Sequence, residues 1–188
     1  PIWTGIAGAN SIQVPLKDDE THDLDAMLDA LTPETRVIFI CSPNNPTGQI
    51  VDRDELEKFI RQVPVEVVIV LDEAYIEYVP EEKRSDSLRL YRKHSNIVIL
   101  RTFSKAYGLA GLRVGFSISQ EPITQALRKT AMPFGVSSLA QAAAIASINA
   151  EPELLERVAS VVAERERVFS ALNAGGYELQ PSYANFIW

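Results

Sequence analysis

Lys105 stands in a segment whose side chains suit a ligand that carries both a phosphate and an aldehyde. Thr102 and Ser104 precede it, Arg113 follows it, and two glycines lie between Lys105 and Arg113. Hydroxyl groups and a guanidinium bind phosphate, and an amine condenses with an aldehyde. Since an isolated lysine is usually a solvated surface group, this interpretation depends on what the fold places beside Lys105.

Two more segments combine rigid backbone with polar side chains. In Ser42-Pro-Asn-Asn-Pro-Thr-Gly48 the prolines fix φ, and Asn45 precedes Pro46 at a bond that proline allows to be cis. The Asn45 amide is therefore a candidate for holding a ligand, although Asn-Pro-Thr-Gly is also ordinary turn chemistry.

The third segment, Asp72-Glu-Ala-Tyr75, follows an apolar run in which an unpaired carboxylate would be costly. Asp72 either caps a helix or accepts a backbone hydrogen bond, or it holds a ring nitrogen of a ligand protonated. In the second case Tyr75 brings a phenol to the same ligand.

Short β-branched runs alternate with helical stretches, which predicts an α/β fold with a mostly parallel sheet and helices on both faces. Ligands of such sheets bind beyond the carboxyl ends of the strands, where all three segments fall. Strands are expected at 11–14, 36–41, 67–71, 96–100 and 113–118, and a further one at 184–188. Helices are expected at 24–31, 52–63, 85–94 and 138–149, and from 152 to the glycines at 175 and 176.

The last helix is long enough to leave one domain and enter another. We therefore expect a large domain over residues 1–150, and a linker helix with the start of a smaller α/β domain over 151–188. The absence of an initiator Met and an end inside an expected strand suggest that the chain is an excerpt of a longer protein.

Composition excludes several other classes of function. The formal charge is -7 and the sequence holds no basic cluster, so neither nucleic acid nor an anionic membrane is an expected partner. The single cysteine, Cys41, excludes an intrachain disulfide and a multi-cysteine metal site. His22 and His94 have no partner at metal-ligand spacing, so we expect no metal. Without an apolar run of membrane-spanning length, the expected location is the cytoplasm.

The segments Cys41–Gly48, Asp72–Tyr75 and Arg101–Gly115, in this order and spacing, resemble the class I/II, fold-type I aminotransferases that depend on pyridoxal 5'-phosphate. Within that family they are most similar to the histidinol-phosphate aminotransferases. Pro181–Phe186 resembles the segment that opens the small domain of the family, so the likeness extends over essentially the whole chain.

The resemblance implies a role for each candidate residue. Lys105 would carry the cofactor as a Schiff base and, once freed, move a proton between substrate and cofactor as general base and acid. Asp72 would pair with the pyridinium nitrogen and keep the ring an electron sink. Tyr75 and Asn45 would donate hydrogen bonds to the 3-oxygen of the cofactor.

The phosphate of the cofactor would be bound by Ser104, Arg113 and Thr102. Other parts of the site, including the arginine for the substrate carboxylate, are expected outside residues 1–188. Trp3 is left out of the site as a packing residue. The resemblance also implies a homodimer.

The expected reaction is transamination of histidinol phosphate in histidine biosynthesis, with glutamate and 2-oxoglutarate as the second pair of amino donor and 2-oxo acid acceptor. An aromatic amino acid aminotransferase and a threonine-phosphate decarboxylase are the alternatives within the same cofactor chemistry. A cofactor domain without turnover is the alternative outside enzymes.

Overall fold

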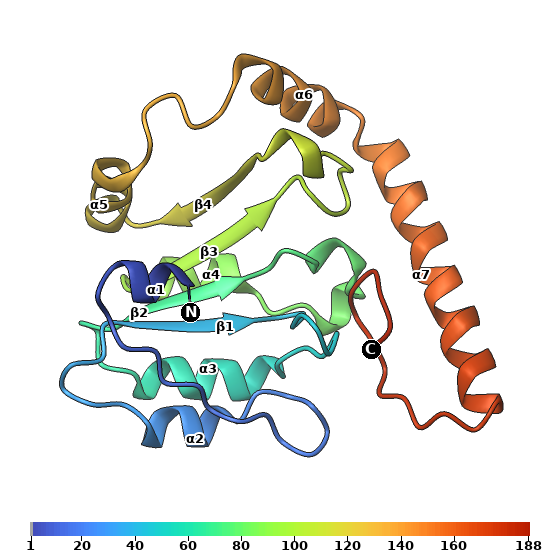
Figure 1. Ribbon diagram of the computed structural model, residues 1–188, viewed down its shortest axis with the longest axis horizontal. Helices are drawn as coiled ribbons and strands as arrows, with labels where there is room; N and C mark the ends of the chain where they lie inside the picture. Colours follow the sequence, from blue (N-terminus) through green and yellow to red (C-terminus); the bar gives the residue numbers. More distant parts are fainter. Residues whose placement is uncertain (1) are drawn as a thin grey trace.

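A parallel sheet forms the centre of the protein. The computed structural model describes residues 2–188, apart from the side chain of Trp3. Within these residues one four-stranded sheet has the order β1 (Val37–Cys41), β2 (Val68–Asp72), β3 (Ile97–Thr102) and β4 (Gly115–Ser119). The first three strands are parallel and β4 is antiparallel to β3. The expected α/β class with a mostly parallel sheet is confirmed (Figure 1).

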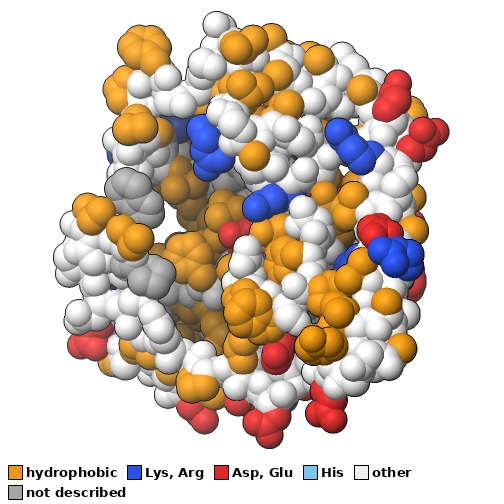
Figure 2. All heavy atoms as spheres, turned by 45° about the vertical axis from the view of Figure 1, so that its right-hand side comes forward, with side chains coloured by type: hydrophobic (Ala, Val, Ile, Leu, Met, Phe, Trp, Pro, Cys, Tyr) orange, Lys and Arg blue, Asp and Glu red, His pale blue; other side chains and the backbone are white. Residues whose placement is uncertain are grey.

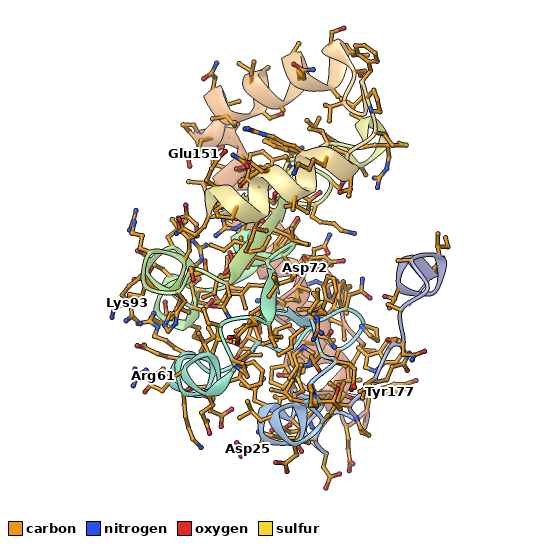
Figure 3. All side chains as sticks on the ribbon, turned by 90° about the vertical axis from the view of Figure 1, so that its left-hand side faces the viewer. Asp25, Arg61, Asp72, Lys93, Glu151 and Tyr177 are labelled. Carbon is orange, nitrogen blue, oxygen red and sulfur yellow. The ribbon has the colours of Figure 1, made fainter. Side chains whose placement is uncertain are left out.

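The main hydrophobic core lies between one face of this sheet and three helices, α2 (Leu24–Asp29), α3 (Arg53–Gln62) and α4 (Ser87–Lys93). Figure 3 shows Arg61 of α3 and Lys93 of α4 on the same side of the molecule. Alternate strand residues such as Ile38 and Ile40 point into this core, because side chains of a strand alternate between faces.

On the opposite face of β1 the side chains are more exposed. Val37 is 47% exposed and Phe39 is 60% exposed, although both are apolar. Figure 2 shows hydrophobic side chains around a hollow in one face of the molecule.

Aspartates begin the helices that cover the core. The Asp52 carboxylate accepts hydrogen bonds from the backbone N–H groups of Asp54 and Glu55 at 2.8 and 3.1 Å. Asp23 and Asp86 cap α2 and α4 in the same way. Each cap satisfies N–H groups that have no partner inside the helix, so the polar starts of these helices follow directly from sequence.

The other helices lie toward the two ends of the chain. They are α1 (Ile2–Ile6), α5 (Glu121–Thr130), α6 (Ser138–Asn149) and α7 (Glu151–Ala174), with short 3-10 turns at Ile76–Tyr78, Glu81–Lys83 and Ala110–Leu112. The sequence predicted α6 and α7 correctly but not α1 or α5. Among residues 2–188, no helix combines the length and the apolarity that crossing a membrane requires.

Helix α7 packs across the carboxyl ends of the parallel strands (Figure 1). Leu154 and Val158 on its buried side contact the cluster that contains Tyr75 and Tyr78. The long helix thus lies against residues of the sheet domain, and the division of the chain into two domains near Glu151 stays a prediction.

Two strand predictions were wrong. The strand predicted at 113–118 is present as β4, and it is antiparallel to β3 because a loop and one 3-10 turn join the two strands and no crossover helix carries the chain back between them. Residues 11–14 form no strand. Residues 184–188 form none either, since the backbone of Ala184 bonds to the side chains of Ser182 and Arg165 instead of to a neighbouring strand.

Candidate functional site

The three polar segments follow the carboxyl ends of β1, β2 and β3. Cys41 is paired with Asp72, and Asp72 with Leu100, so the ends of the three strands lie side by side. The backbone N–H of Ser42 also donates to the carbonyl of Asp72 at 3.0 Å. As Figure 1 shows, these ends point toward α7 and the C-terminal segment.

Asn45, Tyr75 and Lys105 meet in this region although they come from three different loops. The Asn45 amide donates a hydrogen bond to the Tyr75 hydroxyl at 2.9 Å. The Lys105 ammonium lies 5.1 Å from the centre of the Tyr75 ring, within range of a cation–π interaction. The peptide bond between Asn45 and Pro46 is cis, as the sequence allowed.

Tyr75 is the most buried member of this group. Its side chain is 5% exposed, and the Phe186 ring packs edge-on against it with 5.3 Å between ring centres. Ala184 belongs to the same apolar cluster. Phe186 was not predicted as a site residue, because only the resemblance of its segment, and no chemical feature, marked it.

Asp72 is the last residue of β2, three residues before Tyr75, and Figure 3 shows it near the middle of the molecule. Its carboxylate accepts a hydrogen bond from the backbone N–H of Ala74 at 3.1 Å, so the local hydrogen bond considered from the sequence is present. In the part of the chain that the structure describes, no ion pair involves Asp72. The carboxylate is therefore open to a cationic partner.

Burial and the charge of Asp72 both affect the pKa of the Cys41 thiol. Burial, together with the negative charge of Asp72, raises the pKa of the Cys41 thiol to about 11. The thiol is therefore protonated at neutral pH. The His22 Nε2–H donates to the Cys41 carbonyl at 2.9 Å, and burial lowers the pKa of His22.

The predicted phosphate contacts are less closely gathered. The Thr102 hydroxyl accepts a hydrogen bond from the Ser104 backbone N–H at 3.0 Å, so it shapes the loop before Lys105. Arg113 is exposed, and its guanidinium donates to the Ala110 carbonyl at 2.8 Å. No hydrogen bond within residues 2–188 joins Arg113 to another predicted site side chain. The structure thus brings together Asn45, Tyr75 and Lys105, while the exposed Arg113 guanidinium bonds to its own loop.

A buried ion pair between Glu73 and Arg101 was also missed. Glu73 directly follows Asp72, and Arg101 directly precedes Thr102. Opposite charges at the ends of two neighbouring strands could have predicted this ion pair. Among the described residues, no group of three or more His, Cys, Asp or Glu side chains could hold a metal ion.

Comparison with known proteins gives one family. A family model described as aminotransferase class I and II matches residues 4–188. The aromatic amino acid aminotransferase of Streptomyces coelicolor is 59% identical over 188 residues, which is 100% of this chain and 52% of that protein. A second aromatic amino acid aminotransferase, from Cutibacterium acnes, is 56% identical and is covered to 53%.

Among solved structures, the histidinol-phosphate aminotransferase from Sinorhizobium meliloti in complex with pyridoxal-5'-phosphate is similar, with a TM-score of 0.90 and 33% identity. The match covers 98% of this chain and 50% of that one. The chain therefore spans about half the length of the relatives it matches.

Proposed function

Because the chain belongs to the class I and II aminotransferases, we propose that it forms the cofactor-binding part of an aminotransferase that uses pyridoxal 5'-phosphate. The observation that carries this proposal is the meeting of Asn45, Tyr75 and Lys105 at the carboxyl ends of the strands. There the Asn45 amide donates to the Tyr75 hydroxyl at 2.9 Å, and the Lys105 ammonium lies 5.1 Å from the Tyr75 ring centre.

The side chains present fit the parts of this cofactor. Lys105 is an amine for its aldehyde, the unpaired Asp72 carboxylate is an acceptor for its ring N–H, and Asn45 and Tyr75 are donors for its ring oxygen. Ser104, Thr102 and Arg113 offer hydroxyl and guanidinium donors to its phosphate. When bound, the cofactor supplies an electron-withdrawing ring that stabilises negative charge on the carbon of the substrate.

Lys105 is then the group that moves the proton. Its Nζ would take a proton from the carbon that bears the amino group of the donor, and would then deliver a proton to the cofactor. Tyr75, whose ring centre lies 5.1 Å from the Lys105 Nζ, packs with Phe186 and Ala184 in one apolar cluster. Asp72 would accept the hydrogen bond from the ring N–H and so keep that nitrogen protonated.

For the amino donor we propose an aromatic amino acid, supported by identities of 59% and 56% with two aromatic amino acid aminotransferases. Histidinol phosphate, the donor expected from the sequence motifs, is the second candidate, supported by the structural likeness at 33% identity. Both donors carry a flat ring. The aromatic amino acid carries a carboxylate where histidinol phosphate carries a phosphate ester on a CH2 group. An assay with each donor therefore separates the two candidates.

The test uses the full-length protein with 2-oxoglutarate as acceptor and phenylalanine, tyrosine, histidinol phosphate or threonine phosphate as donor. Formation of glutamate from phenylalanine and tyrosine, at a higher kcat/KM than from histidinol phosphate, supports the first candidate. The reverse order supports the second. Release of carbon dioxide from threonine phosphate, or no turnover with any donor, contradicts the proposed reaction.

We also propose that the protein acts in the cytoplasm as a homodimer. The dimer follows from the family resemblance and is tested by sedimentation of the full-length protein. A monomer that retained full turnover would contradict it.

A further inference from the structure

The Glu73–Arg101 ion pair is the least exposed charged contact near the candidate site. The Glu73 side chain is 2% exposed and that of Arg101 is 26% exposed. Two N–H groups of Arg101 donate to the same oxygen of Glu73, at 2.6 and 2.7 Å. The other Glu73 oxygen accepts a longer hydrogen bond from the Ser85 hydroxyl at 3.4 Å.

This pair joins the residue that follows β2, which ends at Asp72, to β3, which precedes the Lys105 loop. Glu73 directly follows Asp72, and Arg101 lies in β3 four residues before Lys105. The strands stay paired up to this point, since the Glu73 backbone N–H donates to the Leu100 carbonyl at 3.1 Å. Side chains alternate along a strand, so Glu73 points away from the side on which Asp72 lies.

We propose that Glu73 and Arg101 are positioning residues that hold the Lys105 loop at a fixed distance from Asp72, an inference that rests on the proposed function. They touch neither substrate nor cofactor. They act by clamping the end of β2 to the end of β3, behind the face on which the reaction takes place.

Stability alone does not account for such a pair. A buried ion pair costs desolvation that its attraction only offsets, and apolar side chains of similar volume often replace one without loss. Two guanidinium N–H groups that converge on one carboxylate oxygen restrict how the two backbone segments move relative to each other.

Two other charged residues, Glu77 and Arg84, lie near the pair. Glu77 faces Arg101 and Arg84, and burial raises the pKa of Glu77 while these two arginines oppose that rise. The Arg84 guanidinium is held by the backbone carbonyls of Val79 and Glu77. Arg101 is thus the cation that bonds directly to Glu73. Loss of Arg101 would leave the carboxylates of Glu73 and Glu77 close together without it.

The experiment compares four forms of the full-length enzyme: wild type, Arg101→Lys, the double variant Glu73→Leu with Arg101→Met, and Glu57→Gln. The double variant replaces the pair by apolar side chains of similar size. Glu57→Gln is the matched control, because Glu57 also pairs with an arginine, Arg89, but on α3 and away from the site.

We expect the double variant to fold, to keep its KM, and to lose kcat by about 10- to 100-fold, since small displacements of catalytic groups have effects of this size. The pH midpoint of the visible absorbance of the bound cofactor should shift in the same variant. Arg101→Lys keeps the charge but not the fork of donors, so it should show both changes in weaker form. Glu57→Gln should show neither.

Unchanged kcat and an unchanged absorbance midpoint in a folded double variant, or in Arg101→Lys if the double variant does not fold, would overturn the proposal. Failure of the proposed function looks different. In that case the wild type itself shows no cofactor-derived mass on Lys105 after borohydride reduction.

Discussion

Gly48 offers a quantitative test of how the loop after β1 meets the C-terminal segment. Its φ is +76°, a region that a residue with a Cβ adopts only under strain, and a Cβ placed there would lie 2.7 Å from the Cβ of Ser182. Gly48→Ala should lower the free energy of unfolding by about 2 to 5 kcal/mol, of which about 1 to 2 comes from the backbone and about 1 to 3 from the overlap.

The same change should also disturb the candidate site. The Tyr183 backbone N–H donates to the Gly48 carbonyl at 2.8 Å, and Gln49 Nε2 donates to the Pro181 carbonyl at 3.0 Å. Movement of this segment shifts Phe186, which packs on Tyr75. Cofactor affinity should therefore fall together with stability.

Urea denaturation followed by circular dichroism measures the first effect, and titration with pyridoxal phosphate measures the second. Gly176→Ala is the matched control, because Gly176 also has a positive φ, +91°, but a Cβ there has nothing within 4 Å. The control should lose only the backbone part, about 1 to 2 kcal/mol, and keep its cofactor affinity. Equal losses in the two variants would refute the packing described here.

Three further predictions concern titratable groups. Burial lowers the pKa of His22 below its ordinary 6.5, so the unfolded chain binds the proton more tightly and stability is lost as pH falls below 6.5. Urea titrations at pH 7 and 5 should show a smaller loss for His22→Gln than for wild type, and equal losses would contradict this. Burial raises the pKa of Glu77 above its ordinary 4.5, which destabilises the fold as pH rises through that range. Glu77→Gln should therefore be more stable than wild type at pH 7 but not at pH 4, and a variant less stable at pH 7 would argue against it. Because its thiol pKa is about 11, Cys41 should react with iodoacetamide at pH 8 about 100-fold more slowly than a cysteine with a pKa of 9; labelling of the folded protein followed by mass spectrometry checks this, and labelling at the rate of a free thiol would be the opposite result.

The core of the fold could be predicted because its signals are local. The apolar runs that became β1, β2 and β3, and the aspartate at position 52, act through backbone geometry and nearby N–H groups. No local sequence signal sets the direction of β4. It depends on how the loop at 103–114 turns back, and strand periodicity does not distinguish the two directions.

The candidate site shows the same division. Asn45, Tyr75 and Lys105 could be predicted to meet, because each follows a parallel strand and such strand ends share one edge of the sheet. The contact of Phe186 with Tyr75 could not, since it brings together residues far apart in sequence through the packing of α7. Arg113 belongs to a specific motif, but its exposed guanidinium bonds to the carbonyl of Ala110 in its own loop.

The most direct test of the account is to find the residue that binds the cofactor. The full-length protein is incubated with pyridoxal 5'-phosphate, reduced with borohydride, digested and measured by mass spectrometry, in parallel with Lys105→Ala. We expect a cofactor-derived mass on Lys105 in the wild type and none on any lysine of the variant. A reduced adduct on another lysine, or an adduct that persists in Lys105→Ala, would contradict it.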